Sequence, residues 1–278
     1  MSVEALPYTL LLLLAQFTAG SAAIVLFCQA RGGFEPAFIR ICTWLTVSGA
    51  AATTLLVLVL DVGVNVAGYS LDPDLASPVR AVSLALLLFS VVHAYFVRRD
   101  DEAFLAYATG ATAMGVGFVL LALLASMVRL PVWSIAGLLL TLGAGAITLG
   151  AVTVAMIWGH WYLVNPKLDE RPLNELVLIC LVALAVEIVA TALNAIVPVG
   201  QPFESDALLA VELARNPGFW LRVGIGLLFP IVLAYMAYRS SKERSMMSAT
   251  GLLYIAVGAV LAGEAVGRGL LFVTGAPV

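Results

Sequence analysis

Residues 103–128, AFLAYATGATAMGVGFVLLALLASMV, decide the fold, because these 26 positions hold no charged side chain. A helix needs about 20 apolar residues to cross about 30 Å of hydrocarbon. The segment therefore predicts a membrane-spanning helix. A second uncharged run, residues 130–166, extends over 37 positions. It predicts one tilted or protruding helix, since no reverse turn divides it into two.

The composition of the whole chain supports the same class. Its 278 residues are 62% hydrophobic and 11% charged, and the mean hydropathy is +1.06. Soluble domains are about 45–50% apolar and about 25% charged. These values exclude a soluble enzyme, a disordered chain and a secreted disulfide scaffold. The net charge of −3 also excludes a nucleic-acid partner, which requires a basic surface.

Eight stretches are long and apolar enough to span a bilayer. We predict an all-α fold, a polytopic integral membrane bundle of eight transmembrane helices that forms a single domain over residues 1–278. Transmembrane β-strands are excluded because the apolar runs are continuous and long. The predicted helices cover about residues 6–30, 39–60, 79–98, 103–128, 131–163, 173–197, 219–239 and 248–273.

The distribution of Lys and Arg predicts the orientation. Nine of these residues fall in the connections after the first, third, fifth and seventh helices, and four lie on the opposite side. The positive-inside rule places the first set in the cytoplasm. Both termini are then expected outside, and the chain is expected in a bacterial inner (cytoplasmic) membrane as a multi-pass protein.

Five ionisable residues fall inside the predicted helices, where charged groups are costly and usually functional. Two of them, His93 and His160, are the only histidines of the chain, and each begins a His-x-Tyr-x-Val sequence at a predicted cytoplasmic helix end. Two imidazoles at matched depth are suited to be axial ligands of a b-type haem. The alternatives are interfacial anchoring and a hydrogen bond to a quinone head group. No other metal site and no catalytic residue is expected.

The other three ionisable residues point to the outer side. Glu264 and Arg268 are four residues apart, so they share one helix face and can pair. Glu187 and the mid-helix Gln16 are expected at the same side of the membrane. A carboxylate, an arginine and an amide in an apolar setting predict a quinol-binding site, in which the carboxylate takes a proton. The alternative is a structural Glu–Arg pair.

One segment also resembles a known family. Residues 261–269, LAGEAVGRG, look like the last helix of the membrane anchor subunit of bacterial dimethyl sulfoxide reductases, and Gln16 followed by Ala19-Gly20 is similar to the first helix. The resemblance implies a quinol-oxidising anchor for a partner with iron–sulfur and molybdenum chemistry. It implies site roles for Gln16, Glu264 and Arg268. Anchors of that family hold no haem, so the resemblance and the histidine pattern point in different directions.

The leading functional expectation is a membrane subunit of a respiratory oxidoreductase. It would exchange electrons with the quinone pool, directly or through a b-type haem, and would anchor an iron–sulfur or cytochrome partner. Such a subunit is not a complete enzyme by itself. The alternatives are a transporter or channel, in which intramembrane ionisable residues line a pathway, and an assembly or scaffold subunit without a cofactor. A transporter is expected to have a Gly/Pro break in a helix of one half of the chain and an equivalent break in the other half. The sequence has no such pair of breaks, which counts against this alternative.

Overall fold

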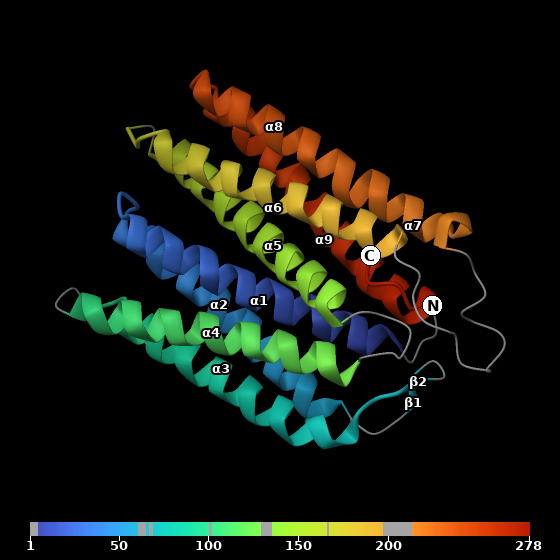
Figure 1. The fold of residues 1–278 in the computed structure, drawn as a ribbon. Helices are drawn as coiled ribbons and strands as arrows, with labels where there is room; N and C mark the ends of the chain where they lie inside the picture. The colour runs from blue at the N-terminus through green and yellow to red at the C-terminus, as the bar shows by residue number, and fades with distance from the viewer. Residues whose placement is uncertain are drawn as a thin grey trace.

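The computed structural model describes residues 5–60, 65–66, 69–99, 102–128, 135–165, 167–196 and 213–278. Eight helical spans in these ranges are long and apolar enough to cross a membrane, which confirms the predicted all-α membrane bundle (Figure 1). They are α1 (Leu6–Arg31), α2 (Pro36–Val59), α3 (Ala76–Phe96), α4 (Ala103–Met127), α5 (Ile135–Val164), α6 (Arg171–Ile196), a seventh span made of α7 (Pro217–Leu221), η5 (Arg222–Leu228) and α8 (Phe229–Lys242), and α9 (Met246–Thr274).

The helix ends agree with the prediction to within three residues wherever they are described. The predicted positions 131–134 and 197 lie outside the described residues. Local chemistry explains several ends: Pro36 occupies the first turn of α2, where its missing N–H costs no hydrogen bond. Gly275 ends α9 in the left-handed conformation, which glycine adopts without strain. Outside the spans lie a small hairpin, β1 (Asn65–Val66) with β2 (Tyr69–Ser70), and the short helices η2 (Pro73–Leu75) and η4 (Leu213–Arg215).

Helix α1 lies in the middle of the bundle (Figure 1). It packs against α2 and α4 on one side and against α5 and α9 on the other. Helices α6 and α8 complete the second side through contacts with α5 and α9. Helix α1 begins and α9 ends at the same end of the bundle, hereafter the terminal end. An even number of spans requires this arrangement.

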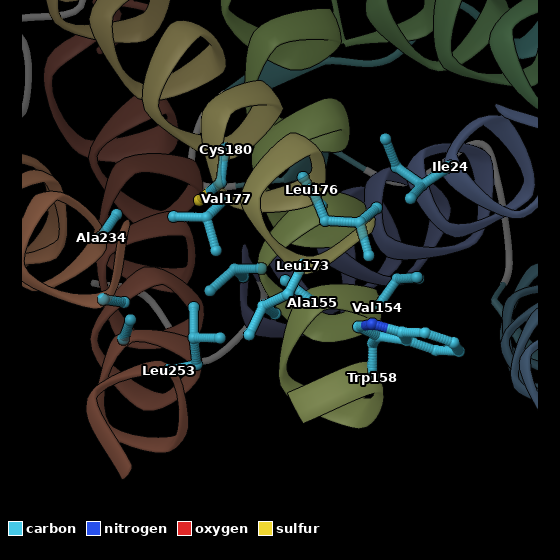
Figure 2. Close-up of a cluster of buried hydrophobic side chains, with 14 of the residues drawn as sticks. Ile24, Val154, Ala155, Trp158, Leu173, Leu176, Val177, Cys180, Ala234 and Leu253 are labelled. Carbon is cyan, nitrogen blue, oxygen red and sulfur yellow. The ribbon is translucent and has the colours of Figure 1, made fainter. Parts of the chain in front are cut away.

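The half of the bundle away from the terminal end is held by an apolar core around Trp158 of α5. Its indole is fully buried and lies edge-on to Phe34 and Phe38, with ring centroids 4.8 Å apart in both pairs. Side chains from α6, α8 and α9 complete this core, among them Leu173 and Leu253 (Figure 2). The three cysteines of the chain are buried and free, as expected of small apolar core residues.

Glycines set the closest helix contacts. A Cβ atom at Gly20 of α1 would fall on the backbone carbonyl of Ala146 in α5, and one at Gly150 would fall on the backbone of Gly20. Gly226 of η5 and Gly263 of α9 meet in the same way. Lipid chains are as apolar as helix surfaces, so close van der Waals contact between small residues is a main source of helix association in a membrane.

We expect Gly20→Ala to destabilise the protein by about 1–3 kcal/mol, the usual cost of overpacking, because the added methyl group meets backbone rather than a mobile side chain. A denaturant titration in mixed micelles measures the change. Gly258→Ala in α9 is the matched control, since its Cβ meets no atom within 4 Å. It should be neutral or gain up to about 1 kcal/mol of helix propensity. Equal effects at both positions would contradict the prediction.

The seventh span contains an irregularity that the prediction of eight regular helices did not include. Residues Arg222–Leu228 form a π-helical stretch between α7 and α8. Pro230 lies in the first turn of α8 and has no N–H to donate to the preceding turn, which disturbs the regular hydrogen-bond pattern. Short π-helical stretches inside α-helices occur frequently at functional sites. This one places Arg222 at its first position.

Candidate functional site

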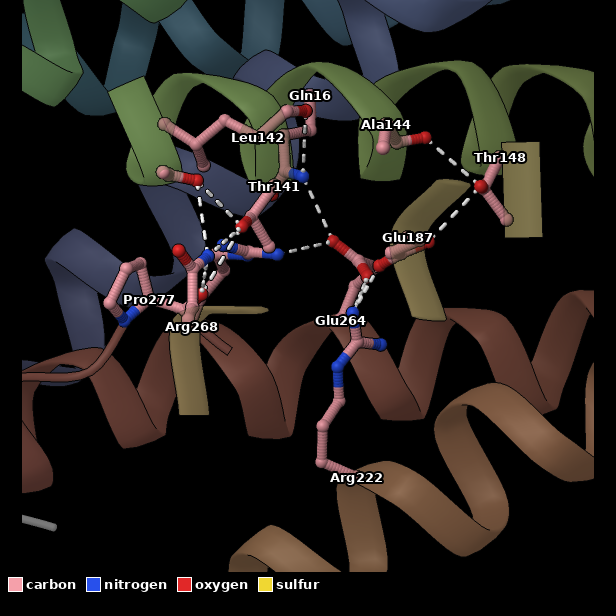
Figure 3. Close-up of polar contacts among 12 residues, drawn as sticks. Gln16, Thr141, Leu142, Ala144, Thr148, Glu187, Arg222, Glu264, Arg268 and Pro277 are labelled. Atoms are coloured by element: carbon pink, nitrogen blue, oxygen red, sulfur yellow. Dashed lines mark hydrogen bonds and ion pairs between the residues drawn. The ribbon is translucent and has the colours of Figure 1, made fainter. Parts of the chain in front are cut away.

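Five polar side chains from four spans meet inside the bundle (Figure 3). They belong to Gln16 of α1, Glu187 of α6, Arg222 of η5, and Glu264 and Arg268 of α9, and are called the polar cluster below. Each is at most 1% exposed. Gln16 is nearer the start of α1 than its end, and Glu264 is nearer the end of α9. The cluster therefore lies in the half of the bundle towards the terminal end.

Glu264 is the centre of the cluster. Its Oε2 accepts hydrogen bonds from Gln16 Nε2 at 2.9 Å and from Arg268 Nη2 at 3.0 Å. Its Oε1 lies 2.7 Å from Arg222 Nη2. The predicted pairing of Glu264 with Arg268 is therefore confirmed, and Gln16 joins the same carboxylate from a helix 248 positions away in sequence. One carboxylate thus ties together α1, η5 and α9.

Glu187 forms the second centre. Its Oε1 is ion-paired with Arg222 Nη2, and its Oε2 accepts a hydrogen bond from Thr148 Oγ1 of α5 at 3.1 Å. Arg222 therefore bridges the two carboxylates. The prediction that Glu187 lies near Glu264 is confirmed, although the link between them is an arginine that the predicted site did not include.

The charges of the cluster balance, because two guanidinium groups face two carboxylates. A single charged side chain at the centre of a bilayer costs about 2.5–3.5 kcal/mol on insertion scales. Replacing both partners of a buried pair by apolar residues is often neutral or stabilising. Stability alone is therefore a weak reason for the chain to carry four charges here, and the cluster is a candidate for function.

Several buried polar atoms of the cluster have no hydrogen-bond partner among the described residues. They are Gln16 Oε1, Arg222 Nε and Nη1, Arg268 Nε and Nη1, and Glu264 Oε1, whose 2.7 Å contact with Arg222 Nη2 is an ion pair. Arginine nitrogens only donate, whereas the amide oxygen only accepts. Leaving such groups unpaired in an apolar interior costs about 1–3 kcal/mol each, and more for charged groups. The cluster therefore offers N–H donors and acceptor oxygens to a polar ligand.

Two structural features lie beside the cluster. A Cβ at Gly145 of α5 would fall on the Glu264 carboxylate and on the Gln16 amide, so only glycine leaves room for their contact. At the terminal end, residues 275–278 fold back over the bundle, and Asn194 Nδ2 of α6 donates to Pro277 O at 2.7 Å. Asn194 also bonds Thr141 Oγ1 at 2.9 Å. Its side chain donates to Gly137 O, Thr141 Oγ1 and Pro277 O, so it secures this segment and not the cluster.

The structure gives the two histidines separate partners. His93 of α3 is buried, its Nε2 lies 2.9 Å from Gln29 Oε1 of α1, and its ring lies against Gly110 of α4. His160 of α5 is exposed, and its Nδ1 lies 3.1 Å from Tyr254 Oη of α9. A bis-histidine haem requires both imidazoles to face one slot from opposite sides. These two rings face different helices, so the arrangement does not fit that cofactor, and the haem stays a prediction from the sequence.

Arg222 is the functional candidate that the predicted site omitted. It lies near the start of the seventh span, where arginine is ordinary, yet it is fully buried. The span begins at Pro217, two residues before the predicted start at 219, so Arg222 lies more than one turn inside it. Asp61, which follows the second predicted helix and is therefore expected at this side of the membrane, lies outside the described residues.

The sequence matches no known protein family. No curated protein is significantly similar to it either. The resemblance to dimethyl sulfoxide reductase anchors therefore stays a prediction, and the functional argument rests on the polar cluster.

Proposed function

We propose that the protein is a membrane subunit of a respiratory oxidoreductase, which exchanges electrons with the quinone pool and anchors a partner that carries further redox centres. The observation that carries this proposal is the buried Glu264 carboxylate, which is surrounded by unpartnered donors of Arg222 and Arg268 and by the unpartnered Gln16 Oε1. A quinol has two hydroxyl groups to donate, and the quinone has two carbonyl oxygens to accept.

The cluster has hydrogen-bonding groups suited to the hydroxyl groups of a quinol and to the carbonyl oxygens of a quinone. Gln16 Oε1 accepts a hydrogen bond from a quinol hydroxyl, and guanidinium N–H groups bind the carbonyl oxygens of the quinone. Oxidation of one quinol releases two protons and two electrons. Glu264 takes one proton as a general base, and Glu187, joined to it through Arg222, takes the second. The electrons pass to an iron–sulfur or cytochrome partner.

The proposal includes the orientation expected from the Lys and Arg distribution. With both termini outside a bacterial inner membrane, the cluster lies in the outer half of the bilayer, and protons leave to the outside. The apolar spans are compatible with lipid contact on all sides of the bundle. The two histidines lie towards the opposite end and take no part.

Binding of a tail-less quinol analogue to the protein in nanodiscs tests the proposal. We expect Gln16→Leu to weaken binding about 10-fold, the loss of one good hydrogen bond to a buried group. This substitution changes no charge, so the ion pairs that hold the fold remain. Arg239→Gln is the control, because this exposed residue of α8 lies outside the cluster and pairs with Glu243 and Tyr235. If Gln16→Leu leaves the affinity for the analogue unchanged, the proposal is overturned.

One observation favours a second candidate, a transporter or channel. The π-helical stretch begins at Arg222, so the charged cluster lies beside a backbone segment of the kind found at functional sites. Quinone-independent proton or ion flux into liposomes, sensitive to Arg222 substitution, would favour that candidate. A protein with neither flux nor quinone binding would be an assembly or scaffold subunit.

A further inference from the structure

Residues 275–278 follow α9 and turn back into the bundle at the terminal end. Gly275 has a φ of 72°, a conformation that glycine adopts without strain and that changes the direction of the chain. Ala276 and Val278 are 6% and 0% exposed, and both pack with Leu270 of α9 in a small apolar cluster. The segment is therefore part of the protein interior, although it is not helical.

One carbonyl group fastens this segment to the bundle. Pro277 O accepts hydrogen bonds from Asn194 Nδ2 of α6 at 2.7 Å and from Thr141 Oγ1 of α5 at 3.1 Å. Asn194 and Thr141 are called the latch below. A hydrogen bond of this kind shifts an equilibrium only about 2- to 10-fold. The latch therefore holds the segment without fixing it permanently.

The latch lies between the polar cluster and the terminal end. Helix α6 ends at the terminal end and α5 begins there, so Asn194 lies seven residues beyond Glu187 and Thr141 lies seven residues before Thr148. At about 1.5 Å per residue, the latch is about 10 Å nearer the terminal end than the contact between Glu187 and Thr148. Any path from the cluster to water at this end passes the latch.

The segment also reaches the edge of the cluster. A Cβ atom at Gly267 of α9 would lie 2.6 Å from Val278 O and 3.0 Å from Arg222 Nε, so both atoms lie beside one point of α9. Figure 3 shows Pro277 next to Arg268. The segment therefore covers the cluster from the terminal end.

A buried hydroxyl group lies beneath the latch. Thr191 is one turn from both Glu187 and Asn194 on α6, so the three share a helix face. It is 3% exposed, and its Oγ1 has no hydrogen-bond partner among the described residues. Helical threonines commonly donate to the carbonyl one turn back, as Thr148 does to Ala144 O. Since buried polar groups without a protein partner commonly bind water, Thr191 is suited to hold water between the latch and the cluster.

The proposed quinol chemistry requires a route by which protons leave. Glu187 and Glu264 are at most 1% exposed, so neither carboxyl group contacts bulk water while the segment is in place. Each takes one proton from a quinol and must release it before the next quinol is oxidised. A part of the covering structure must therefore open.

We propose that residues 275–278 form a hinged gate between the polar cluster and the water at the terminal end. Gly275 is the hinge, and the latch holds the gate closed. When the latch opens, water reaches Thr191 and the carboxyl groups of the cluster, and each carboxyl group releases its proton to this water and becomes a carboxylate again. This inference rests on the proposed function and assigns to the segment the step in which the protons leave.

Cysteine accessibility tests the gate without any quinone. The parent chain carries alanine at its three native cysteines, which are buried and free, and the substitution Thr191→Cys. Because the Thr191 hydroxyl has no partner among the described residues, this exchange breaks none of the described hydrogen bonds. A charged methanethiosulfonate, which does not cross lipid, is added to the protein in nanodiscs, and mass spectrometry follows the labelling. Removing the latch with Thr141→Val and Asn194→Leu should speed labelling at position 191 at least about 10-fold, since two hydrogen bonds are lost.

Two controls accompany this comparison. Thr141→Ser keeps the hydroxyl that donates to Pro277 O, so labelling at position 191 should stay at the rate of the parent chain. Thr250→Cys places a thiol at a buried position of α9 in the half of the bundle away from the terminal end. Labelling at position 250 reports general loosening, and the latch substitutions should leave its rate unchanged.

The gate and the proposed function can fail separately. If the latch substitutions leave labelling at position 191 unchanged, or accelerate positions 191 and 250 equally, the segment is not a gate. That result leaves head-group binding at the cluster intact. If position 191 becomes accessible as expected, but the tail-less analogue binds the wild-type and Gln16→Leu proteins alike, the gate is present and the proposed function fails.

Discussion

Replacing Arg222 by alanine is expected to lower the free energy of unfolding by about 3–5 kcal/mol, the cost of breaking a buried ion pair from one side. Arg222 Nη2 bridges Glu187 and Glu264. Without it, Glu187 keeps the hydrogen bond from Thr148 but has no facing guanidinium, and the cluster carries one uncompensated negative charge inside the membrane. Water cannot enter freely to solvate that charge, so the loss is close to the full penalty.

Removing Glu187 together with Arg222 should restore most of the lost stability. The double variant Arg222→Ala/Glu187→Leu leaves Glu264 paired with Arg268, and the cluster is neutral again. Apolar replacement of both partners of a buried pair is often neutral or stabilising. The single and double variants, with Glu187→Leu as the second single, complete a double-mutant cycle.

A denaturant titration in mixed micelles measures all three variants. Arg239→Ala is the control for removing an arginine, because its pair with Glu243 is exposed and such pairs contribute about 0–1 kcal/mol. A loss below about 1 kcal/mol for Arg222→Ala, or a double variant as unstable as the single, would show that the pair is not desolvated as described.

Introducing one methyl group at Gly145 is expected to disturb the whole cluster. A Cβ there would fall on Glu264 Oε2 and Gln16 Nε2 and would lie 2.9 Å from Glu264 Cδ. The carboxylate must then move away from Gln16 and Arg268, which now donate to it at 2.9 and 3.0 Å. We expect a loss of about 2–4 kcal/mol, because overpacking adds to newly unsatisfied buried groups.

The change should reach the proposed binding site as well as stability. In Gly145→Ala, binding of the tail-less quinol analogue should fall at least about 10-fold, because Gln16 and Arg268 no longer meet at the Glu264 carboxylate. Gly143→Ala, two residues away on the same helix, meets no atom within 4 Å and serves as the control. If the two variants behaved alike, Gly145 would not be the residue that makes room for the carboxylate.

Most of the fold could be predicted from the sequence because a bilayer imposes simple rules. Uncharged runs of fixed minimum length become helices, and all eight spans are at their predicted places. The pairing of Glu264 with Arg268 was equally accessible, since residues four apart share a helix face. Both the eight spans and this pair follow from residues that are close in the sequence and from the apolar bilayer around them.

The rest of the site depends on which helices are neighbours, and the sequence carries no local signal for that. Arg222 is near a helix start, so the pattern alone could not distinguish an interfacial arginine from a buried bridge. The matched sequences at His93 and His160 predicted a shared site, yet α3 and α5 turn them towards Gln29 and Tyr254 respectively. Equal depth in a membrane does not imply the same neighbours.

The sequence distances inside the polar cluster have a consequence for how the chain is made. Ribosomes add about 5–20 residues per second. Arg268 follows Glu264 by four residues and Arg222 follows Glu187 by 35, so each acid meets a base within about seven seconds of synthesis. Glu264 follows Gln16 by 248 residues, so about 12–50 s separate the synthesis of the two residues. Gln16, however, carries no charge. During membrane insertion, charged side chains are the most costly to leave unpaired in lipid, and their partners are close in the sequence. Only the uncharged amide of Gln16 depends on a partner that is made much later.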